Sequence, residues 1–464
     1  MPGLFQTLEV GKRALMGSQV TLQTIGHNIA NVNTPGYSRQ RVDLLSTPPE
    51  VTSIGSIGTG ISVGDINHIR DLFLGDQYRQ ENKSLGQWSY KEKILSQLEG
   101  LVGEPNDNSL SDLLNGFWDA WSDLSTDPTS TSNRVALIEK ARLLTNGFNQ
   151  LADQLNNLRD SVDQELDQYT GEINRLASQI ASLNQQIKIQ ELGGKHANDL
   201  RDTRDQLIDN LSSLIDVNSR EEANGMAVVS IGAMAIVDGT KTIPIGTKVV
   251  NDGGVMKHDL VWQGTDIGIT NLKGEVKGLL EVREEIIPGY LKQLDDLSAS
   301  LVKEVNAVHQ TGYGLDGSTG TNFFDTKYVN AANLKINDEI VNSPGKIAAS
   351  ASGEVGDNTL ALDISDMRNT RLMLDGTASF NEYYNAMVGS LGSDSRQAQS
   401  LTQNYKLVTT QLTNAKESVQ GVSLDEEMTN MVKYQHAYDA AARVVTAMDQ
   451  ALDTVITGMG IVGR

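Results

Sequence analysis

The chain has 464 residues, of which 39% are hydrophobic and 21% are charged, and it contains no cysteine. This length suffices for about two to four domains of ordinary size, and the absence of thiols excludes disulfides and thiolate metal sites. A formal net charge of −21 argues against a nucleic-acid partner, because binding to phosphates requires clustered Lys and Arg. Neither a long apolar run nor a short apolar stretch behind a basic N-terminus is present. We therefore expect no membrane insertion and, if the protein is exported, no cleaved signal peptide.

The first predicted element is an N-terminal helix with a heptad seam. Its seam residues recur in alternating steps of four and three, which is the spacing of a coiled coil rather than of a globular helix. Gly11 and Ser18 occupy seam positions where a second backbone could approach closely. The apolar seam residues are Leu4, Leu8, Leu15, Leu22, Ile25, Ile29 and Val32.

A turn motif follows this helix. Pro35 disfavours helical geometry at Thr34, and Gly36 can supply the positive φ of a type II turn, so the helix must end here. Read without any relative, the stretch predicts only a helix stop before a β segment. The motif residues are Asn28, Ala30, Asn31, Thr34, Pro35, Gly36 and Tyr37.

Residues 43–70 are rich in Gly, Thr, Ser and Val and predict turns and short strands, because their glycines lack the spacing of a phosphate-binding loop. A long apolar seam then runs from Phe148 to Ile187 with one stutter. Gly193-Gly194 ends this helix, and we expect it to fold back on a helix that begins near Ala197. Before the seam, helical patterns cover residues 71–100, 109–124 and 132–145.

Composition changes at Val217. Residues 217–271 contain short alternating runs of Val, Ile and Thr with Gly-rich turn signals, which predict a small β domain inserted into a helical body. A helical pattern returns at Gly274 and extends to Val308. Residues 325–376 predict strands and loops, and from Phe380 the chain is predicted to be helical to its end.

The C-terminal helix carries a second heptad seam. Ser423 and Glu426 predict a capping box at its start, and three acids in the first turn suit the helix dipole. Residues 1–42 hold four basic side chains against one acid, and residues 423–459 hold six acids against two bases, so the two ends should attract each other. The residues assigned to the start and seam of this helix are Ser423, Leu424, Glu426, Met431, Tyr434, Tyr438, Val445, Met448, Leu452 and Val455.

These patterns predict a mainly α fold with a smaller β part. We expect the N- and C-terminal helices to pair as a coiled coil, beside a body of long helices and the inserted small β domain. The predicted units are an inner domain (1–45 with 420–464), a helical body (46–216 with 274–324 and 377–419), a β domain (217–273) and a mixed segment (325–376).

The sequence contains no motif of a known catalytic site. The six histidines are scattered, and there is no His-Glu-x-x-His, Walker loop or Gly-x-Ser-x-Gly elbow. His309 is best explained as a structural histidine, and the acids at 425–427 as helix-start residues rather than metal ligands. Phe117, Trp118 and Trp121 are expected to anchor a core. We therefore expect no catalytic residue, no metal and no cofactor.

The stretch from Gly26 to Val42 closely resembles the N-terminal signature shared by the rod, hook and hook-associated proteins of the bacterial flagellum. Residues 274–324 and the block from Ser418 to Met428 resemble, more narrowly, the hook-filament junction proteins. The resemblance implies a structural protein of the extracellular flagellum whose terminal helices form the inner domain of a tubular assembly. It also implies export by the flagellar type III apparatus.

The partners implied by this resemblance are further copies of the chain in a ring, the hook protein on one side, and the other hook-associated junction protein and flagellin on the other. An export chaperone would grip the C-terminal helix before assembly. Because isolated helices are marginal without packing, residues 1–45 and 425–464 are expected to be largely disordered in the free chain. Three alternatives stay open: a hook or distal rod protein, a cell-wall hydrolase on a flagellar scaffold, and a membrane-inserting secretion translocator.

Overall fold

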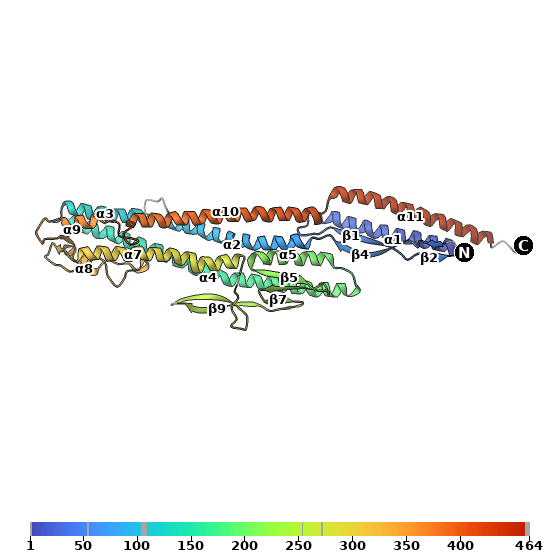
Figure 1. Ribbon diagram of the computed structural model, residues 1–464, viewed down its shortest axis with the longest axis horizontal. Helices are drawn as coiled ribbons and strands as arrows, with labels where there is room; N and C mark the ends of the chain where they lie inside the picture. Colours follow the sequence, from blue (N-terminus) through green and yellow to red (C-terminus); the bar gives the residue numbers. More distant parts are fainter. Residues whose placement is uncertain (1, 53–54, 104–108, 253, 271, 460–464) are drawn as a thin grey trace.

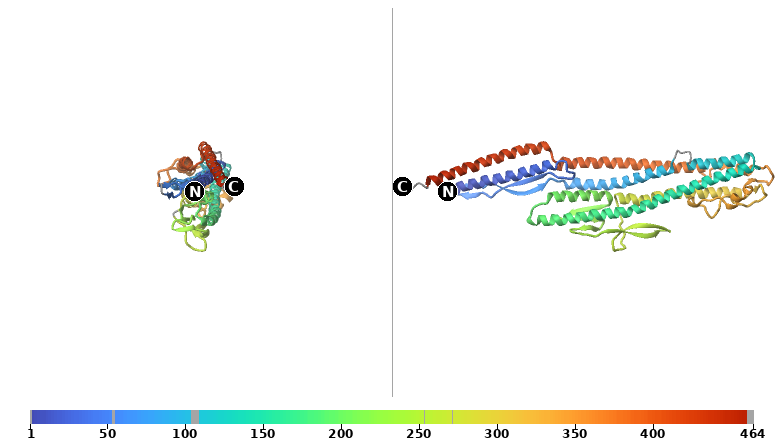
Figure 2. Two further views of the ribbon diagram at one scale, coloured as in Figure 1. Left: turned by 90° about the vertical axis from the view of Figure 1, so that its right-hand side faces the viewer. Right: turned by 180° about the vertical axis from the view of Figure 1, so that it is seen from behind.

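The computed structural model describes residues 2–52, 55–103, 109–252, 254–270 and 272–459. The described chain is mainly helical and forms a long rod (Figure 1). Its first and last helices lie together at one end of the rod, and the view from behind in Figure 2 shows the long helices running side by side along it. The predicted fold class, mainly α with a smaller β part and paired terminal helices, is therefore confirmed.

The terminal helices α1 (Pro2–Ala30) and α11 (Leu424–Met459) pack against each other, and we call them the terminal pair. Strands β1 (Gln40–Ser46) and β4 (Ile61–His68) form an antiparallel hairpin that also packs on α1. α1 thus lies between α11 and a hairpin, a packing that periodicity did not reveal. The hairpin is extended by the short strands β2 (Glu50–Thr52) and β3 (Gly55–Ile57).

The predicted N-terminal seam is too long by its last residue. α1 ends at Ala30, and Val32 lies in the following turn, where its N–H donates to the Ile29 carbonyl at 3.4 Å. The Asn31 side chain donates to the His27 carbonyl at 3.0 Å, so this side chain satisfies one of the carbonyls that the helix leaves free.

The helical body consists of antiparallel long helices. One of them is longer than predicted, because the helices expected at 132–145 and 148–187 form a single helix of 60 residues. Gly147 does not interrupt it: a Cβ there would lie 2.4 Å from a Leu113 methyl, so the glycine permits a close approach of α3. The helices are α2 (Leu72–Val102), α3 (Leu110–Thr126), α4 (Thr131–Gln190), α5 (Asn198–Leu214), α6 (Glu275–Glu281), α7 (Ile287–His309) and α10 (Phe380–Gln420).

The turns between the helices follow their sequence signals. Ser130 caps α4, and Ser379 forms a capping box with Glu382 at the start of α10. After the short 3-10 helix η1 (Glu191–Gly193), Gly194 adopts a φ of 72°, so the chain can reverse into α5 as predicted.

A π-helical segment that the sequence did not predict, η2 (Val282–Ile286), joins α6 to α7. Pro288, the second residue of α7, has no N–H to donate to the carbonyl four residues earlier, which accounts for the wider turn at this point.

The core of the body runs along its length and is aromatic at the end far from the terminal pair. Phe117, Trp118 and Trp121 of α3 are at most 1% exposed, and the Phe117 ring lies 5.9 Å from both Phe323 and Phe324. The three aromatic residues are therefore core anchors, as the sequence indicates.

The described residues of the predicted β region form six strands on the outside of the body, next to α4 (Figure 1). Four form an antiparallel sheet in chain order, and the last two form a separate hairpin. The sheet contains β5 (Val217–Glu221), β6 (Ala227–Ile231), β7 (Met234–Asp238) and β8 (Lys241–Thr242), and the hairpin β9 (Ile245–Asp252) and β10 (Val255–Trp262).

The prediction of strands in residues 325–376 is largely wrong. One strand of this segment, β12 (Ala348–Ser350), pairs with β11 (Tyr313–Gly314), and the rest of its regular structure is helical. Such short helical turns have no readable period, and they are held by packing: Leu360, Ala361 and Ile364 are buried where α9 meets α3. The helical elements are η3 (Ala331–Asn333), α8 (Asp338–Asn342), η4 (Pro344–Lys346) and α9 (Thr359–Asp366).

Candidate functional site: the joint between terminal pair and body

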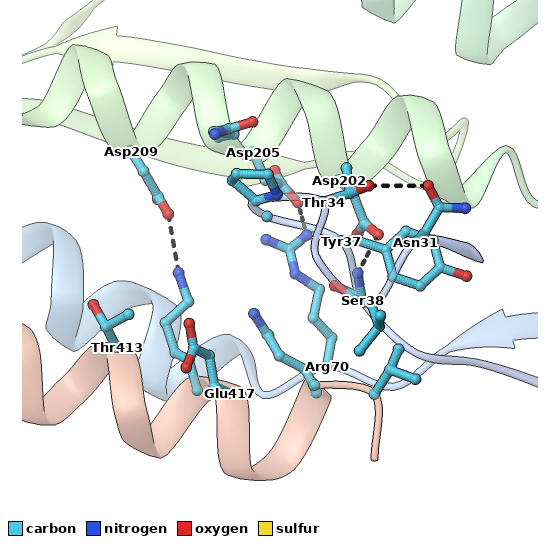
Figure 3. A pocket seen from close by; sticks show the side chains of 18 of the residues that line it. Asn31, Thr34, Tyr37, Ser38, Arg70, Asp202, Asp205, Asp209, Thr413 and Glu417 are labelled. Atoms are coloured by element: carbon cyan, nitrogen blue, oxygen red, sulfur yellow. Dashed lines mark hydrogen bonds and ion pairs between the residues drawn. The ribbon is translucent and has the colours of Figure 1, made fainter. Parts of the chain in front are cut away.

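The terminal pair meets the helical body at a region that we call the joint (residues 27–40, 65–79, 196–210 and 413–427). A polar cavity of about 820 Å³ lies in it, lined by the turn motif, α5 and the connection between α10 and α11 (Figure 3). The joint is where four distant parts of the sequence converge, so its contacts decide how the terminal pair is held.

The turn motif forms the predicted turn. The Tyr37 N–H donates to the Thr34 carbonyl at 3.2 Å, and Gly36 has a φ of +78°, as a type II turn requires at that position. A Cβ on Gly36 would also lie 3.3 Å from the Gln206 side chain of α5. Glycine therefore serves both the backbone conformation and the close approach of this turn to the body.

Asn28 is the central residue of the motif. Its side chain is 1% exposed, and its Oδ1 accepts hydrogen bonds from the Tyr37 hydroxyl at 2.7 Å and the Gln40 N–H at 2.9 Å. Its Nδ2 donates to the Gln40 carbonyl at 2.9 Å and to Glu427 Oε2 at 3.2 Å. One buried amide therefore ties together α1, the turn, β1 and α11. Burial and nearby carboxylates raise the pKa of Tyr37, so its hydroxyl remains a donor.

Arg39 connects the motif to the start of α11. Its guanidinium donates to Glu427 Oε1 and Glu426 Oε2, both at 2.7 Å, and its backbone N–H donates to the Gln420 carbonyl at 2.7 Å. The predicted capping box is therefore wrong: Glu426 pairs with Arg39, and the exposed Ser423 contributes its backbone carbonyl to Glu427 N–H. The ion pairs of Arg39 with Glu426 and Glu427 are an instance of the predicted electrostatic attraction between the two ends of the chain.

Three carboxylates of α5, spaced by three and four residues, face the terminal segments. Asp202, 6% exposed, accepts the Ser38 N–H at 2.7 Å on Oδ2, and His68 Nδ1 of β4 lies 3.0 Å from its Oδ1. The sequence analysis predicted a helix from about Ala197 but did not identify this acidic face. The spacing of Asp202, Asp205 and Asp209 by three and four residues, which places them on one side of a helix, was the signal that could have identified this face.

The other two α5 carboxylates bind cations from three further segments. Asp205 pairs with Arg70, which lies between β4 and α2, and burial lowers the pKa of that guanidinium. Asp209 accepts hydrogen bonds from Arg79 of α2 at 2.7 Å and Lys416 of α10 at 3.0 Å. Every segment that leads from the body into the terminal pair is thus bound to one face of α5. Figure 3 shows the contacts that Ser38, Arg70 and α10 make with this face.

The heptad seams lie between the two terminal helices but are only partly covered. At Gly11 the helices are so close that a Cβ would lie 2.9 Å from Val445 Cγ2, as the small seam residue predicts. Among residues 424–458 of α11, the buried side chains are Glu427 and Ala441. Of the predicted seam residues, Ile25 is buried and Leu424 and Tyr438 are exposed. The others are intermediate: Leu4, Leu8, Leu15, Leu22, Ile29, Met431, Tyr434, Val445, Met448, Leu452 and Val455.

The described residues hold no group of three His, Asp or Glu side chains placed to bind a metal. None of the described helices is both long and apolar enough to span a membrane. His309 lies in the aromatic core, where Nε2 accepts the Ala348 N–H at 2.9 Å and Nδ1 lies 2.7 Å from the Thr321 carbonyl. Burial lowers the pKa of His309 to about 4. The ring is therefore neutral at pH 7, as expected for a structural histidine.

Three parts of the chain match models of flagellar protein families. Residues 95–324 match the flagellar hook-associated protein FlgK helical domain, residues 418–458 the flagellar basal body rod FlgEFG protein C-terminal family, and residues 8–37 the flagella basal body rod protein family. The match over 8–37 includes the N-terminal seam from Leu8 onward, and the match over 418–458 includes the C-terminal seam and the two α11 carboxylates that bind Arg39.

Whole-chain comparisons agree with these matches. Flagellar hook-associated protein 1 of Bacillus subtilis is 34% identical over 100% of both chains, and that of Salmonella typhimurium is 24% identical over 95% of this chain and 98% of the relative. The solved structure of the flagellar hook junction protein FlgK from Burkholderia pseudomallei has a TM-score of 0.63 at 16% identity, covering 74% of this chain and 100% of that one, which shows a shared fold. The chain belongs to the flagellar hook-associated protein 1 family.

Proposed function

We propose that this chain is a structural component of the flagellum that forms the junction between hook and filament. The observation that carries the proposal is the end-to-end match to hook-associated protein 1 of Bacillus subtilis, with 34% identity over both whole chains. This match favours a hook-associated protein over a hook or distal rod protein, which shares only the terminal motifs. The protein acts by holding neighbours together rather than by catalysis.

The terminal pair supports self-association into a ring. Most seam side chains of α11 are half-exposed in a single copy, and Met428 and Val432 beside the seam are 53% and 50% exposed. Burying such side chains yields about 25 cal/mol per Å² of apolar surface, so neighbouring copies gain by covering them. We infer that the hook protein contacts the ring on one side, and that the other hook-associated junction protein and flagellin contact it on the other.

The joint supports a role between two structures of different shape. The terminal pair is bound to the body by ion pairs and hydrogen bonds, whereas the body has a continuous apolar core. Polar contacts around a cavity can rearrange at lower cost than a close-packed core. A ring built on such joints can accommodate a curved hook and a straighter filament.

We further infer an extracellular location at the hook-filament junction, reached by flagellar export without a cleaved signal peptide. Before assembly, the face of α11 from Met431 to Met459 would be covered by an export chaperone. The predicted apolar seam side chains between Met431 and Val455 are at least partly exposed in the single chain and would otherwise associate prematurely. A membrane-inserting translocator finds no support in the described helices.

Deletion of the gene tests the proposed function. Mutant cells should keep hooks, lack filaments and release unpolymerised flagellin, and expression of this chain should restore filaments. Loss of the hooks would indicate a rod or hook protein instead. Incubating the purified chain with peptidoglycan should release no fragments; release would support the wall-hydrolase alternative.

A further inference from the structure

Three of the six histidines of the chain lie at the joint, and each faces a carboxylate across the boundary between the terminal segments and the body. Of the other three, His258 lies on β10, His309 lies in the core of the body and His436 is exposed on α11. The pairs are His27 of α1 with Asp199 of α5 at 3.2 Å, His68 of β4 with Asp202 of α5 at 3.0 Å, and His196, ahead of α5, with Asp65 of β4 at 3.3 Å.

The His68 pair is the most buried of the three, with side chains that are 16% and 5% exposed. Asp202 accepts one neutral N–H, that of Ser38, and its second oxygen faces the His68 ring. Arg70 lies in the field of Asp202 but forms its own ion pair with Asp205. A proton on His68 therefore supplies Asp202 with a cationic donor, and a charge-assisted hydrogen bond is roughly twice as strong as a neutral one.

The His27 pair is more exposed and adds less. His27 is 41% exposed and faces Asp199, which also accepts a hydrogen bond from Gln40 Nε2 at 2.6 Å. Its other neighbours, the Asn31 amide and the Tyr37 ring at 5.6 Å, carry no charge. Asn31 Nδ2 donates to the His27 carbonyl at 3.0 Å and lies 3.3 Å from His27 Nδ1, so a proton on this ring gains a charged contact with Asp199 but removes an acceptor within α1.

The His196 pair is exposed to a similar degree. His196 is 43% exposed and faces Asp65 and, at 3.9 Å, Glu191, which is already bound to Arg201. The groups that face the three histidines are therefore mainly acidic, and a proton on each ring strengthens a contact across the boundary.

We propose that the joint is a proton-sensitive clasp, in which protonation of His27, His68 and His196 tightens the docking of the terminal pair on the body. Histidine is the side chain whose ordinary pKa places its charge change between pH 5 and 8. The ion pairs of Asp205 with Arg70 and of Asp209 with Arg79 and Lys416 involve no histidine, so the joint stays formed when the histidines are neutral and becomes less stiff. The biological meaning of the clasp rests on the proposed junction function, because a junction protein crosses from the cell interior to the medium.

The test measures docking in the free full-length chain, so its failure would leave the junction function standing. Because the chain has no cysteine, spin labels can be placed at Thr446→Cys on α11 and Thr410→Cys on α10, both exposed. The expected result is a larger docked population and a narrower distance distribution at pH 5.5 than at pH 8. Amides of residues 31–40 should gain about tenfold protection from hydrogen exchange, after correction for intrinsic rates, which corresponds to about 1.4 kcal/mol.

The triple variant His27→Gln, His68→Gln, His196→Gln should lose this pH response, and His436→Gln should keep it. The single variant His68→Gln, which leaves the other two pairs intact, should lose most of the pH response. It keeps the test decisive if the triple variant misfolds. A pH response that is unchanged in His68→Gln and the triple variant, or absent in the wild-type chain, would overturn the proposal.

Discussion

At Gly11 the backbones of α1 and α11 approach so closely that a side chain there would enter the space of Val445. We predict that Gly11→Leu forces the terminal pair apart, at the roughly 1–3 kcal/mol that overpacking costs. Hydrogen exchange of α11 in the free chain should become faster, and the variant should restore swimming poorly in a deletion strain.

Gly26→Leu is the matched control, because no atom lies within 4 Å of a Cβ at that exposed helical position. It should be neutral or slightly stabilising, since glycine costs about 1 kcal/mol inside a helix. Equal effects of the two substitutions would show that close approach at Gly11 is unimportant.

His309 predicts a pH dependence of body stability. Its pKa in the folded chain is about 4, and an unfolded histidine has a pKa of about 6.5. Between these values the unfolded state binds more protons, so stability falls as the pH drops from 6.5 towards 4, by up to about 3 kcal/mol, and is independent of this group above 6.5. Urea unfolding at pH 7 and pH 5, followed by the fluorescence of the buried tryptophans, measures the difference.

The variant His309→Gln should show a smaller loss of stability between these two pH values than the wild-type chain, and His436→Gln should show the same loss. The prediction fails if His309→Gln and wild type have the same pH dependence. The clasp responds to acid in the opposite direction, which is why the joint and the body must be followed by separate local probes.

At the scale of elements, α5 has two charged faces with different partners. Asp202 and its neighbours bind the terminal segments, whereas Arg204, 1% exposed, donates to Glu221 Oε2 of β5 at 2.6 Å and to the Gly225 carbonyl at 2.7 Å. Buried charges are tolerated only when they are paired, so the helix can occupy only this orientation. α5 thereby holds both the outer β sheet and the joint.

The seam of α11 carries the prediction for assembly. Val445→Asp combined with Leu452→Asp should abolish chaperone binding and junction assembly, because a carboxylate on a surface that becomes buried loses its hydration without gaining a partner. Pull-down with the chaperone and swimming assays measure the two effects, and wild-type swimming would refute the prediction. Thr446→Asp with Thr454→Asp adds the same charges at exposed positions and should leave both functions largely intact.

At the scale of the whole molecule, stability is distributed unevenly along the rod. The main core cluster contains no described residue of the terminal pair, whose helices are covered mainly by each other and by the hairpin on α1. From the sequence we expected both ends to be largely disordered in the free chain. In the structure both ends are helical and packed, so we now expect them to be folded but of low stability. The hairpin, including the buried Val42, supplies cover for α1 that the sequence did not reveal.

We predict that hydrogen exchange in the free chain is fastest in residues 2–45 and 424–459 and slowest around Trp118 and Trp121. Incorporation into hooks should slow exchange at both ends and leave the body unchanged. Exchange at both ends of the free chain that is as slow as in the aromatic core would contradict the prediction.

The sequence by itself determined the features that depend on neighbours along the chain. The heptad spacing of apolar residues, around Leu8 in the first helix and around Val445 in the last, predicts two long helices with seams. Pro35-Gly36 predicts a turn. Both features are local because helix periodicity and backbone sterics act over a few residues. The protein family could also be identified from the sequence, since its motifs are short stretches of neighbouring residues.

Only the tertiary structure decided which polar groups meet at the joint. Asp202 and His68 are 134 residues apart, and Glu426 pairs with Arg39 rather than with the adjacent Ser423. A charged side chain has many possible partners in the sequence, and the choice among them is made by the packing of distant helices, which brings one partner within hydrogen-bond distance and leaves the others in water. The apolar pattern therefore predicted the helices, and their assembly placed the charges of the joint.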